Sequence, residues 1–393
     1  IDKYSQDKVI VFFCDYLKNI YENLIGEKFF ICGTSSHSIY NFRGDLIRDL
    51  KKEKLNIIGF AGHTSKTDIK EIKKLKIKYF DYNIDNTSIN PFKDILAFII
   101  LSIHFINYKP KYTMCYTIKA VIIFGFLKKI FRIRNKSYAL ITGVGNIFVS
   151  ENQLLKYFVK IIYRISLKNY DKVFFLNNDD KLFFFNQKLI NKNKSTEIFR
   201  GSGVNLKQYN SSTYPEIITF SLASRMIENK GINEFCEVAK RLNKKFSNIK
   251  FLICGDFTKS PYSLDREKTL DLFKECNIEY FGWIEYMKNF YEKTSVYVLP
   301  SKREGTPRTV LEAMAMNRPI ITNNVPGCKD TVIDGYNGFL TKLGDASDLQ
   351  DKFELFISNP NLIKEMGINS RARVEDIYDV KKINHQMINS MIN

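Results

Sequence analysis

Two glutamates lie on either side of a predicted helix start and could hold a ligand there. Residues 296–299 form a short apolar run that predicts a strand, and Glu304 lies between this strand and the next helix. Thr306 suits the N-cap of that helix, and Pro307 suits its first position, where a missing N–H group costs nothing. Glu312 lies further inside the helix, off its apolar stripe. Two carboxylates placed in this way favour a ligand that carries hydroxyl groups.

The same helix start predicts an anion site. The first N–H groups of an α-helix have no partner within the helix, and here they belong to Arg308, Thr309 and Val310. The helix dipole also favours negative charge at this end. An anion site beside two acids suggests a nucleotide diphosphate whose hydroxyl groups need acceptors.

Two cations follow the strand predicted at residues 217–223. Arg225 and Lys230 lie in the loop directly after it. Arg grips phosphate oxygens as a fork and Lys acts as a point charge, so the pair could neutralise a diphosphate leaving group. Taken alone, the pair is read equally well as two solvated loop side chains. Gly255 follows the next predicted strand, 250–254, at the same edge of the sheet.

Length and charge limit the possible architectures and partners. A chain of 393 residues is too long for one ordinary core, so we expect two domains. Its net charge of +18 indicates an anionic partner. Residues 95–150 contain no acid, and their bases lie among Phe, Ile and Leu, which favours a membrane surface over a nucleic-acid groove. These bases are Lys109, Lys111, Lys119, Lys128, Lys129, Arg132, Arg134 and Lys136.

Cysteines and apolar runs suggest a cytosolic protein. The seven cysteines, Cys14 among them, show no metal or redox spacing, so we expect reduced core residues. The longest apolar runs, such as 95–106, are too short to span a bilayer, and the charges along 1–25 argue against a signal peptide.

Strands and helices alternate along the chain, which predicts two α/β domains with doubly wound parallel sheets. Ligands would bind in a cleft between them, at the carboxyl ends of both sheets. The expected bounds are 1–210 for the first domain, 211–375 for the second and 376–393 for a terminal helix that packs back on the first. The expected strands lie at 28–32, 56–60, 77–80, 112–116, 138–142, 172–176 and 196–199, then at 217–223, 250–254, 279–281, 296–299 and 319–322.

Several of these motifs occur together in one known family. Arg225 begins an R-x4-K-G arrangement, Glu304 and Glu312 form an E-x7-E pair, and residues 304–307 run into 311–315. With 319–322, 325–328 and 334–339, they resemble the family 4 retaining glycosyltransferases of the GT-B fold. In the first domain, residues 40–44, 116–119 and 142–145 resemble the bacterial branch that builds capsules, O-antigens and lipid-linked oligosaccharides.

The resemblance implies a role for each matching residue. Arg225 and Lys230 would hold the diphosphate, Glu304 would accept from sugar hydroxyls, and Glu312 would accept from ribose hydroxyls. We place Glu304, Arg225 and Lys230 as catalytic. With these cations and a helix terminus available, no metal or other cofactor is expected. The remaining donor-binding residues are Gly305, Thr306, Arg308, Thr309, Val310 and Gly255.

The first domain is expected to bind the acceptor. His37 follows the first strand and could contact donor or acceptor. Arg43 and Lys119 lie near strand ends and could bind an acceptor phosphate, although a surface base is an equal alternative. Gly143 and Gly145 form a G-x-G motif that resembles that of the branch.

We therefore expect a retaining glycosyltransferase that moves an N-acetylhexosamine or hexose from a UDP-sugar to a polyprenyl-diphosphate-linked saccharide. It would be cytoplasmic and peripheral on the inner face of the cell membrane, with an anionic membrane surface and no nucleic acid as partner. One alternative is a UDP-sugar 2-epimerase of the same architecture, against which the acid-free segment 95–150 counts. Another is a non-catalytic module that binds anionic lipid or nucleic acid.

Overall fold

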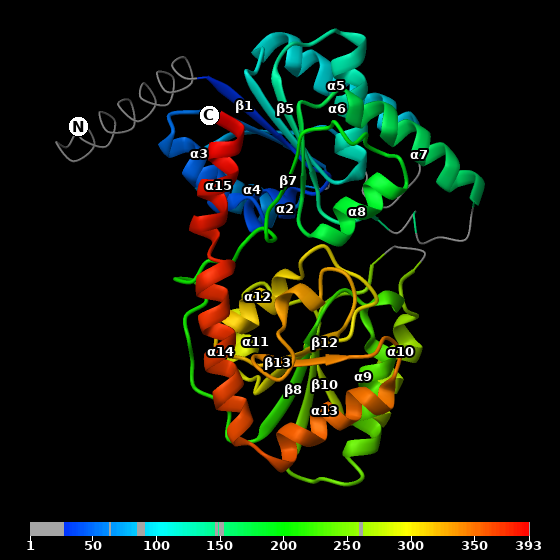
Figure 1. Ribbon diagram of the computed structural model, residues 1–393, viewed down its shortest axis with the longest axis vertical. Helices are drawn as coiled ribbons and strands as arrows, with labels where there is room; N and C mark the ends of the chain where they lie inside the picture. Colours follow the sequence, from blue (N-terminus) through cyan, green and yellow to red (C-terminus); the bar gives the residue numbers. More distant parts are fainter. Residues whose placement is uncertain are drawn as a thin grey trace, which may run out of the picture.

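Two α/β domains make up the protein. The computed structural model describes residues 27–62, 64–84, 91–145, 148, 153–258 and 262–392. Each domain is built around a fully parallel sheet, and the two domains lie one above the other (Figure 1). The predicted pair of doubly wound parallel sheets is confirmed.

The first sheet has its order reversed around its first strand. Its strands run in the order β3-β2-β1-β4-β5-β6-β7. Strands β1 and β4 are therefore neighbours, and the segments that follow them leave in opposite directions along the sheet. Open α/β sheets bind ligands at the carboxyl ends of such a strand pair. The bounds are β1 (Lys28–Cys32), β2 (Asn56–Ala61), β3 (Lys78–Asp81), β4 (Tyr112–Tyr116), β5 (Lys136–Ile141), β6 (Lys172–Phe175) and β7 (Thr196–Ile198).

The second sheet repeats this plan in the order β10-β9-β8-β11-β12-β13. Strand β13 was not predicted, because it is short and begins with Gly338, whose lack of a side chain weakens the apolar pattern. It nevertheless pairs along its length with β12. The bounds are β8 (Ile218–Ala223), β9 (Ile249–Cys254), β10 (Ile278–Tyr280), β11 (Val296–Leu299), β12 (Ile320–Asn323) and β13 (Gly338–Thr341).

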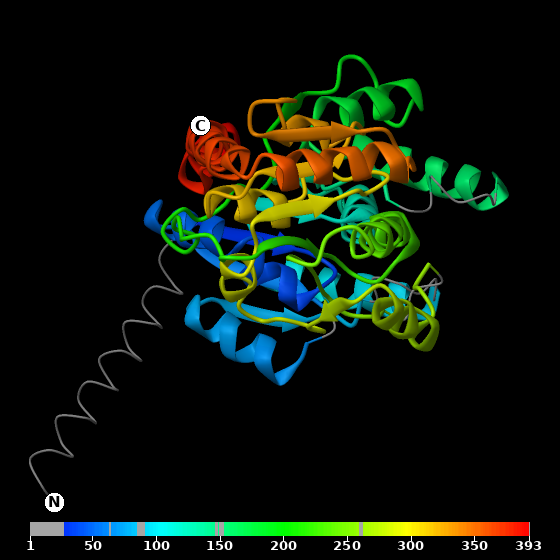
Figure 2. The same cartoon turned by 90° about the horizontal axis from the view of Figure 1, so that it is seen from below.

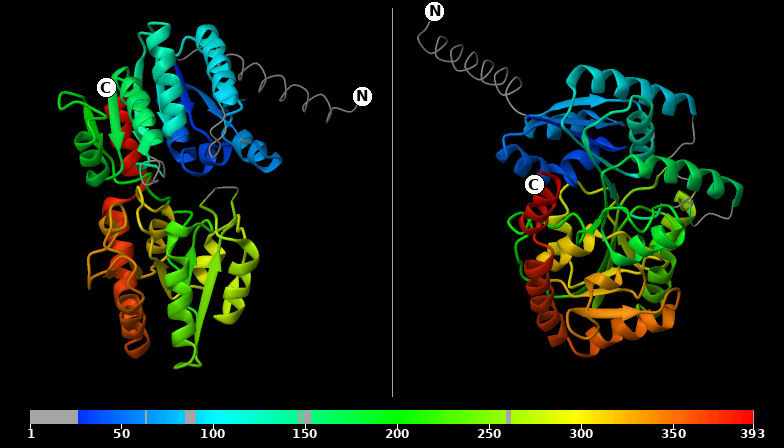
Figure 3. Two further views of the ribbon diagram at one scale, coloured as in Figure 1. Left: turned by 90° about the vertical axis from the view of Figure 1, so that its right-hand side faces the viewer. Right: turned by 45° about the horizontal axis from the view of Figure 1, so that its top comes forward.

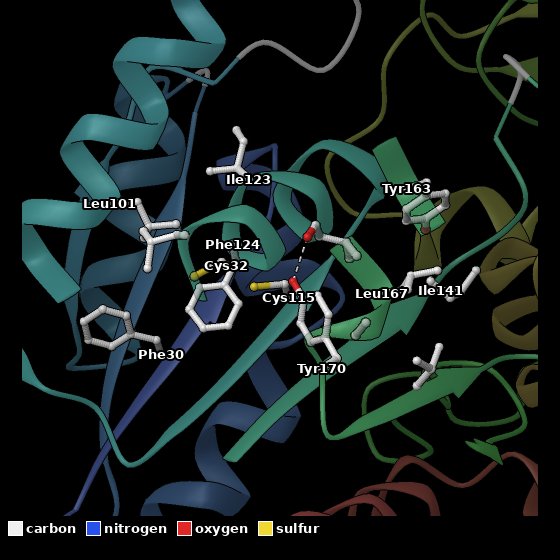
Figure 4. Close-up of a cluster of buried hydrophobic side chains, with 14 of the residues drawn as sticks. Phe30, Cys32, Leu101, Cys115, Ile123, Phe124, Ile141, Tyr163, Leu167 and Tyr170 are labelled. Atoms are coloured by element: carbon white, nitrogen blue, oxygen red, sulfur yellow. Dashed lines mark hydrogen bonds between the residues drawn. The ribbon is translucent and has the colours of Figure 1, made fainter. Parts of the chain in front are cut away.

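Helices cover both faces of the first sheet. One face carries α5 (Pro91–Tyr108), α6 (Ile118–Ile130), α7 (Gln153–Lys168) and α8 (Asn178–Asn186). Figure 4 shows Leu101 of α5, Phe124 of α6 and Leu167 of α7 in one buried cluster with Phe30 and Cys115 of the sheet. The other face carries α2 (Ser36–Asn41), α3 (Gly44–Lys52), α4 (Lys66–Lys74) and α15 (Val380–Ile392).

The second sheet is covered in the same way. One face packs against α9 (Ile232–Leu242), α10 (Arg266–Glu275) and α13 (Ala346–Ser358). The other packs against α11 (Lys288–Glu292), α12 (Arg308–Ala315) and α14 (Asn361–Ile377). Two short 3₁₀ helices, η2 (Glu228–Lys230) and η3 (Lys329–Thr331), lie in loops.

The cysteines of the described residues are free and buried. Cys32 and Cys115 lie together beneath α6, beside Tyr170, whose hydroxyl donates to the carbonyl of Val121 at 2.9 Å (Figure 4). Burial raises the pKa of the Cys32 thiol well above its ordinary value. These thiols are therefore core groups, as predicted, while Cys14 lies outside the described residues.

Helix α5 is longer than its apolar run suggests. It has 18 residues, and by length and composition alone it could cross a membrane, so the prediction that this segment is too short was wrong. In this structure one side of α5 packs into the core through Ala97, Leu101 and Phe105, and the opposite side is exposed on the outside of the first domain (Figure 3).

The last helix belongs to the first domain. After α14 the chain returns across the junction, and α14 and α15 lie together at one side of the molecule (Figure 2). Ile383, Met387 and Met391 of α15 are buried in the first-domain core. The Tyr138 hydroxyl of β5 donates to the carbonyl of Met391.

Replacement of a buried α15 residue should destabilise the first domain. We expect Ile383→Ala to lower the free energy of unfolding by about 2–4 kcal/mol, since it leaves a cavity against α3. The exposed Gln386→Ala is the matched control on the same helix and should change stability by less than about 0.5 kcal/mol. Urea unfolding followed by circular dichroism measures both, and equal stability of the two variants would contradict this packing.

Candidate functional site

Helix α12 begins one residue later than predicted. Its first residue is Arg308, and Pro307 caps it in an extended conformation with ψ 108°. The N–H group of Val310 donates to the Pro307 carbonyl at 3.1 Å, so it is not available to a ligand as predicted. Arg308 and Thr309 are left to present their N–H groups at the helix start.

Thr306 does not cap this helix. Its hydroxyl donates to the carbonyl of Gly305 at 2.9 Å and to that of Leu176, in the first domain, at 3.3 Å. The hydroxyl is therefore committed to the domain junction, which explains why the predicted cap fails.

Glu304 and Lys230 form an ion pair between two loops of the second domain. The Lys230 ammonium contacts Glu304 Oε1, and Ser301 donates to the same oxygen at 2.8 Å. The Lys230 side chain is 13% exposed and the Glu304 side chain is 16% exposed. The loops follow β8 and β11, which are neighbours at the point where the strand order reverses. The two predicted catalytic residues are thus brought together at the ligand-binding edge of the sheet.

Arg225 lies in the same loop after β8 as Lys230, and its side chain is exposed. Within the described part of the chain its guanidinium makes no hydrogen bond or ion pair. Gly255 lies next to it, and a Cβ atom there would overlap the Ser224 carbonyl oxygen, while its φ of +132° also excludes most side chains. Only glycine lets the ends of β8 and β9 approach this closely, so Gly255 shapes the edge rather than offering a side chain.

Glu312 is buried, contrary to its predicted place off the apolar stripe. The residue is 4% exposed. Its Oε1 accepts from Arg308 Nε at 2.8 Å, and its Oε2 accepts from the Tyr291 hydroxyl at 2.9 Å. Each oxygen keeps a further lone pair with which it can accept a ligand hydroxyl. Sequence reasoning missed Tyr291, because its partner lies 21 positions away and no motif links them.

Arg308 joins this carboxylate to the first domain. Its Nη1 donates to the backbone carbonyl of Asn41, and its guanidinium lies 5.3 Å from the centre of the Phe42 ring. The predicted contribution of Arg308 was its N–H group, but its side chain also bridges the two domains.

The loop from 300 to 307 packs directly on the first domain. A Cβ atom on Gly305 would lie 2.5 Å from the Thr142 carbonyl oxygen, and one on Gly143 would lie 3.9 Å from Gly305 N. Asn177 donates to the Gly305 carbonyl at 2.6 Å. The predicted donor residue Gly305 and acceptor residue Gly143 are therefore adjacent. Gly145 lies a little further along, where its lack of a side chain makes room for Ile118.

Two ion pairs that the sequence did not reveal hold the domains together. Arg303 Nη2 lies 2.7 Å from Asp180 Oδ1, whose side chain is fully buried. Lys329 Nζ lies 3.0 Å from Asp179 Oδ2. Burial raises the pKa of the Asp180 carboxyl, against the opposing effect of Arg303. No sequence motif indicated these contacts, which arise because α8 places Asp179 and Asp180 against the second domain.

His37 belongs to a hydrogen-bond chain at the same junction. Asn41 Nδ2 lies 3.0 Å from His37 Nε2, and because an amide N–H group donates, Nε2 accepts and Nδ1 carries the proton. Nδ1 then donates to the Tyr40 hydroxyl at 2.7 Å, which donates to Asp68 Oδ1 at 3.1 Å. Burial lowers the pKa of His37. Its ring centre lies 5.4 Å from that of Trp283, so it meets the second domain.

The structure does not place Arg43 or Lys119 as free surface bases. Arg43 is 3% exposed, donates to Ser202 at 3.0 Å and lies 4.9 Å from the centre of the Tyr116 ring. Burial lowers its pKa to about 10. Lys119 Nζ lies 3.0 Å from Asp94 Oδ1. Arg43 therefore supports the chain at Ser202, where the first domain leads into the second, and Asp94, just outside the acid-free segment, balances Lys119.

Among the described residues, no group of three or more His, Cys, Asp or Glu side chains is arranged to hold a metal ion.

Removal of the Arg303 cation should weaken the domain junction. We expect Arg303→Gln to lower the free energy of unfolding by about 1–3 kcal/mol at pH 7.5, because it leaves the Asp180 carboxylate buried without its partner. A raised pKa in the folded state means that stability falls as pH rises, and loss of Arg303 strengthens this effect, so the cost should be smaller at pH 5. The neighbouring exposed Lys302→Gln is the control. Thermal unfolding at both pH values measures the difference, and a pH-independent cost would contradict the assignment.

Known proteins share both the motifs and the architecture. Residues 206–373 match the family model "Glycosyl transferases group 1". Over 350 residues the chain is 25% identical to N,N'-diacetylbacillosaminyl-diphospho-undecaprenol alpha-1,3-N-acetylgalactosaminyltransferase of Campylobacter jejuni, covering 85% of this chain and 90% of the relative. It is 26% identical over 380 residues to the capsular polysaccharide biosynthesis glycosyltransferase CapM of Staphylococcus aureus, covering 93% and 97%.

A solved structure shows the same fold. The Anabaena protein Alr3699/HepE, in complex with UDP-glucose, superposes with a TM-score of 0.74 at 14% identity, covering 93% of this chain and 99% of that one. The relatives are named as transferases, which disfavours the epimerase and the non-catalytic module. The chain is therefore a glycosyltransferase with the GT-B fold, and residues 206–373 of its second domain match the model of the group 1 glycosyl transferases.

Proposed function

We propose that the protein transfers an N-acetylhexosamine or hexose from a UDP-sugar to a polyprenyl-diphosphate-linked saccharide, with retention at the anomeric carbon. The observation that carries this proposal is the ion pair of Lys230 and Glu304 in the loops after β8 and β11, with the exposed Arg225 in the same loop as Lys230. Cations and an acid at one sheet edge suit a diphosphate joined to a polyhydroxyl group.

Charge development explains the use of these cations. Cleavage of the sugar–phosphate bond places negative charge on the leaving diphosphate and positive charge on the anomeric carbon. Arg225 and Lys230 lie where they can stabilise the leaving group, and the N–H groups of Arg308 and Thr309 add the positive end of the α12 dipole. Because the charged groups are already in place, little reorganisation is needed during the reaction.

The two acids take different parts of the donor. Glu304 lies at the loop that touches the first domain, where the sugar would meet the acceptor, and it accepts from sugar hydroxyls. Glu312 lies deeper, beside Tyr291, and accepts from ribose hydroxyls. The UDP-glucose complex of the Anabaena protein supports UDP as the nucleotide part of the donor.

The acceptor approaches from the first domain. Gly143 faces Gly305, so an acceptor hydroxyl held near residues 142–145 lies close to the donor loop. His37 borders the same junction and is a candidate acceptor contact. The diphospho-undecaprenol in the name of the Campylobacter relative supports a lipid-linked acceptor.

A lipid-linked acceptor requires access to a membrane. The exposed side of α5 carries Ile95, Ile99, Ile103 and Ile106, which are spaced as one helical stripe, and α7 exposes a second stripe. We infer peripheral docking of these helices on the inner face of the cell membrane, with the enzyme in the cytoplasm. Flotation with anionic vesicles at low salt tests this docking, because protein that stays at the bottom of the gradient would contradict it.

A donor and acceptor screen tests the activity. We expect release of UDP that depends on a polyprenyl-diphosphate saccharide, and NMR of the product should show the anomeric configuration of the donor. Glu304→Gln should lower turnover by roughly 100-fold or more with an unchanged circular dichroism spectrum, since it removes the charge beside the reacting sugar. Glu279→Gln, an exposed acid on β10, should behave as wild type. Failure of every donor, or full activity of Glu304→Gln, would overturn the proposal.

We also propose that the transfer needs no metal ion, because Arg225, Lys230 and the α12 N-terminus supply the positive charge. Addition of a chelator to the transfer assay should leave the initial rate unchanged, and restored Mg²⁺ or Mn²⁺ should not raise it. A rate that falls with chelation and returns with a divalent ion would contradict metal independence.

A further inference from the structure

The first domain has a pocket at the end of the sheet that faces away from the second domain. It lies between the last turns of α5 and α6 and the starts of β4 and β5, and its volume is about 640 Å³. The walls include Phe105, Ile106 and Phe131, and the rim carries bases. A volume of this order accommodates a small amphiphile rather than only an ion.

The bases at the rim are not all used for folding. Lys128 lies nearby but is 11% exposed and bonds to Asp171 at 2.6 Å and to the Asn135 carbonyl at 2.9 Å, so its role is structural. Lys111, which lines the pocket, pairs with Glu27. In contrast, Lys109 and Arg134 are exposed and have no ion-pair partner among the described residues.

Lys136 completes this group. It is exposed at the start of β5, 5.9 Å from the centre of the Tyr112 ring, and it too lacks an acidic partner within the described segments. The residues that line the pocket include no Asp or Glu. A rim with three cations that lack an acidic partner, and with Glu27 already paired to Lys111, favours an anionic ligand, and Lys and Arg together suit a phosphate group.

The apolar part of the pocket extends onto the outside of the helices. Ile106 is 54% exposed and Phe131 is 46% exposed, and Ile130 beside it is 60% exposed. Ile106 is also the last residue of the exposed α5 stripe. The pocket therefore opens where the apolar stripe ends, with bases on one side and apolar side chains on the other.

We propose that this pocket binds one anionic glycerophospholipid of the membrane. The phosphate lies against Lys109, Arg134 and Lys136, and the glycerol and first acyl carbons lie against Phe105 and Phe131. Charge complementarity selects the headgroup, and the apolar wall excludes a free phosphate as the natural ligand. The proposal deepens the membrane docking proposed above, and it concerns a site remote from the donor loops.

Helix α5 links this pocket to the domain junction. The helix starts after β3, whose carboxyl end faces the second domain, and it ends at the pocket. A lipid held at the pocket fixes one end of α5 on the membrane, so that the other end, near the domain junction, is held close to the acceptor lipid.

Titration with short-chain lipids below their micelle concentration tests the site without a membrane. Dihexanoyl phosphatidylglycerol should bind saturably to the full-length protein, and dihexanoyl phosphatidylcholine and inorganic phosphate should bind at least about 10-fold more weakly. Equal binding of phosphatidylcholine would show an unselective apolar pocket, and equal binding of phosphate would show a plain anion site. Either result would overturn the proposal.

Charge-removal variants locate the site. The triple variant Lys109→Gln, Arg134→Gln and Lys136→Gln should lose binding of dihexanoyl phosphatidylglycerol and partition into phosphatidylglycerol vesicles on the order of 100-fold more weakly, at roughly five-fold for each base. A matched triple on the second domain, Lys244→Gln, Lys250→Gln and Lys364→Gln, removes the same charge from exposed positions and should bind as wild type. If both triple variants lost lipid binding equally, net charge alone would explain the binding, and this result would contradict a specific site.

Activity separates this proposal from the proposed function. Both triples should transfer sugar to a detergent-solubilised acceptor at the wild-type rate, because none of the six positions lies near the donor loops. If wild-type protein floats with vesicles but does not bind the short-chain lipid, the pocket assignment fails while docking stands.

Discussion

The ion pair of Lys230 and Glu304 is the contact on which the arrangement of the site depends. It forms only because β8 and β11 are adjacent parallel strands, so that the loops after them leave the sheet side by side. The backbone link from Lys302 N to the Asn229 carbonyl at 2.9 Å holds the same two loops together. The fold thus places a cation and an acid from distant parts of the sequence next to the start of α12.

The donor loop also serves as the surface on which the domains meet. Gly305 touches residues 142–143, Arg303 pairs with Asp180, and Arg308 reaches Asn41. Groups that would bind the donor therefore contact groups that would bind the acceptor. A change in the relative position of the domains must therefore break or replace contacts of the donor loop.

Sequence reasoning recovered what local patterns encode. Apolar periodicity located the strands of both sheets apart from β13, and the spacing of Arg225, Lys230 and Glu304 indicated one site. It failed where tertiary packing decides the outcome. Glu312 is acidic and was expected off the apolar stripe, yet Arg308 and Tyr291 make its burial possible. Arg43 was expected either to bind an acceptor phosphate or to be a surface base, but the Tyr116 ring and Ser202 enclose it. A local sequence pattern cannot predict such partners, because they lie in helices, strands or loops that are distant in the sequence.

The return of α15 to the first domain has a consequence for biosynthesis. The core of the first domain includes Ile383, Met387 and Met391, which are translated after every strand of the second domain. The first domain cannot complete this core during its own translation, whereas the second domain has all of its strands before α15 emerges. The first domain therefore starts first but is completed only after the second, and a chain that stops before α15 leaves the first domain with an uncovered apolar face.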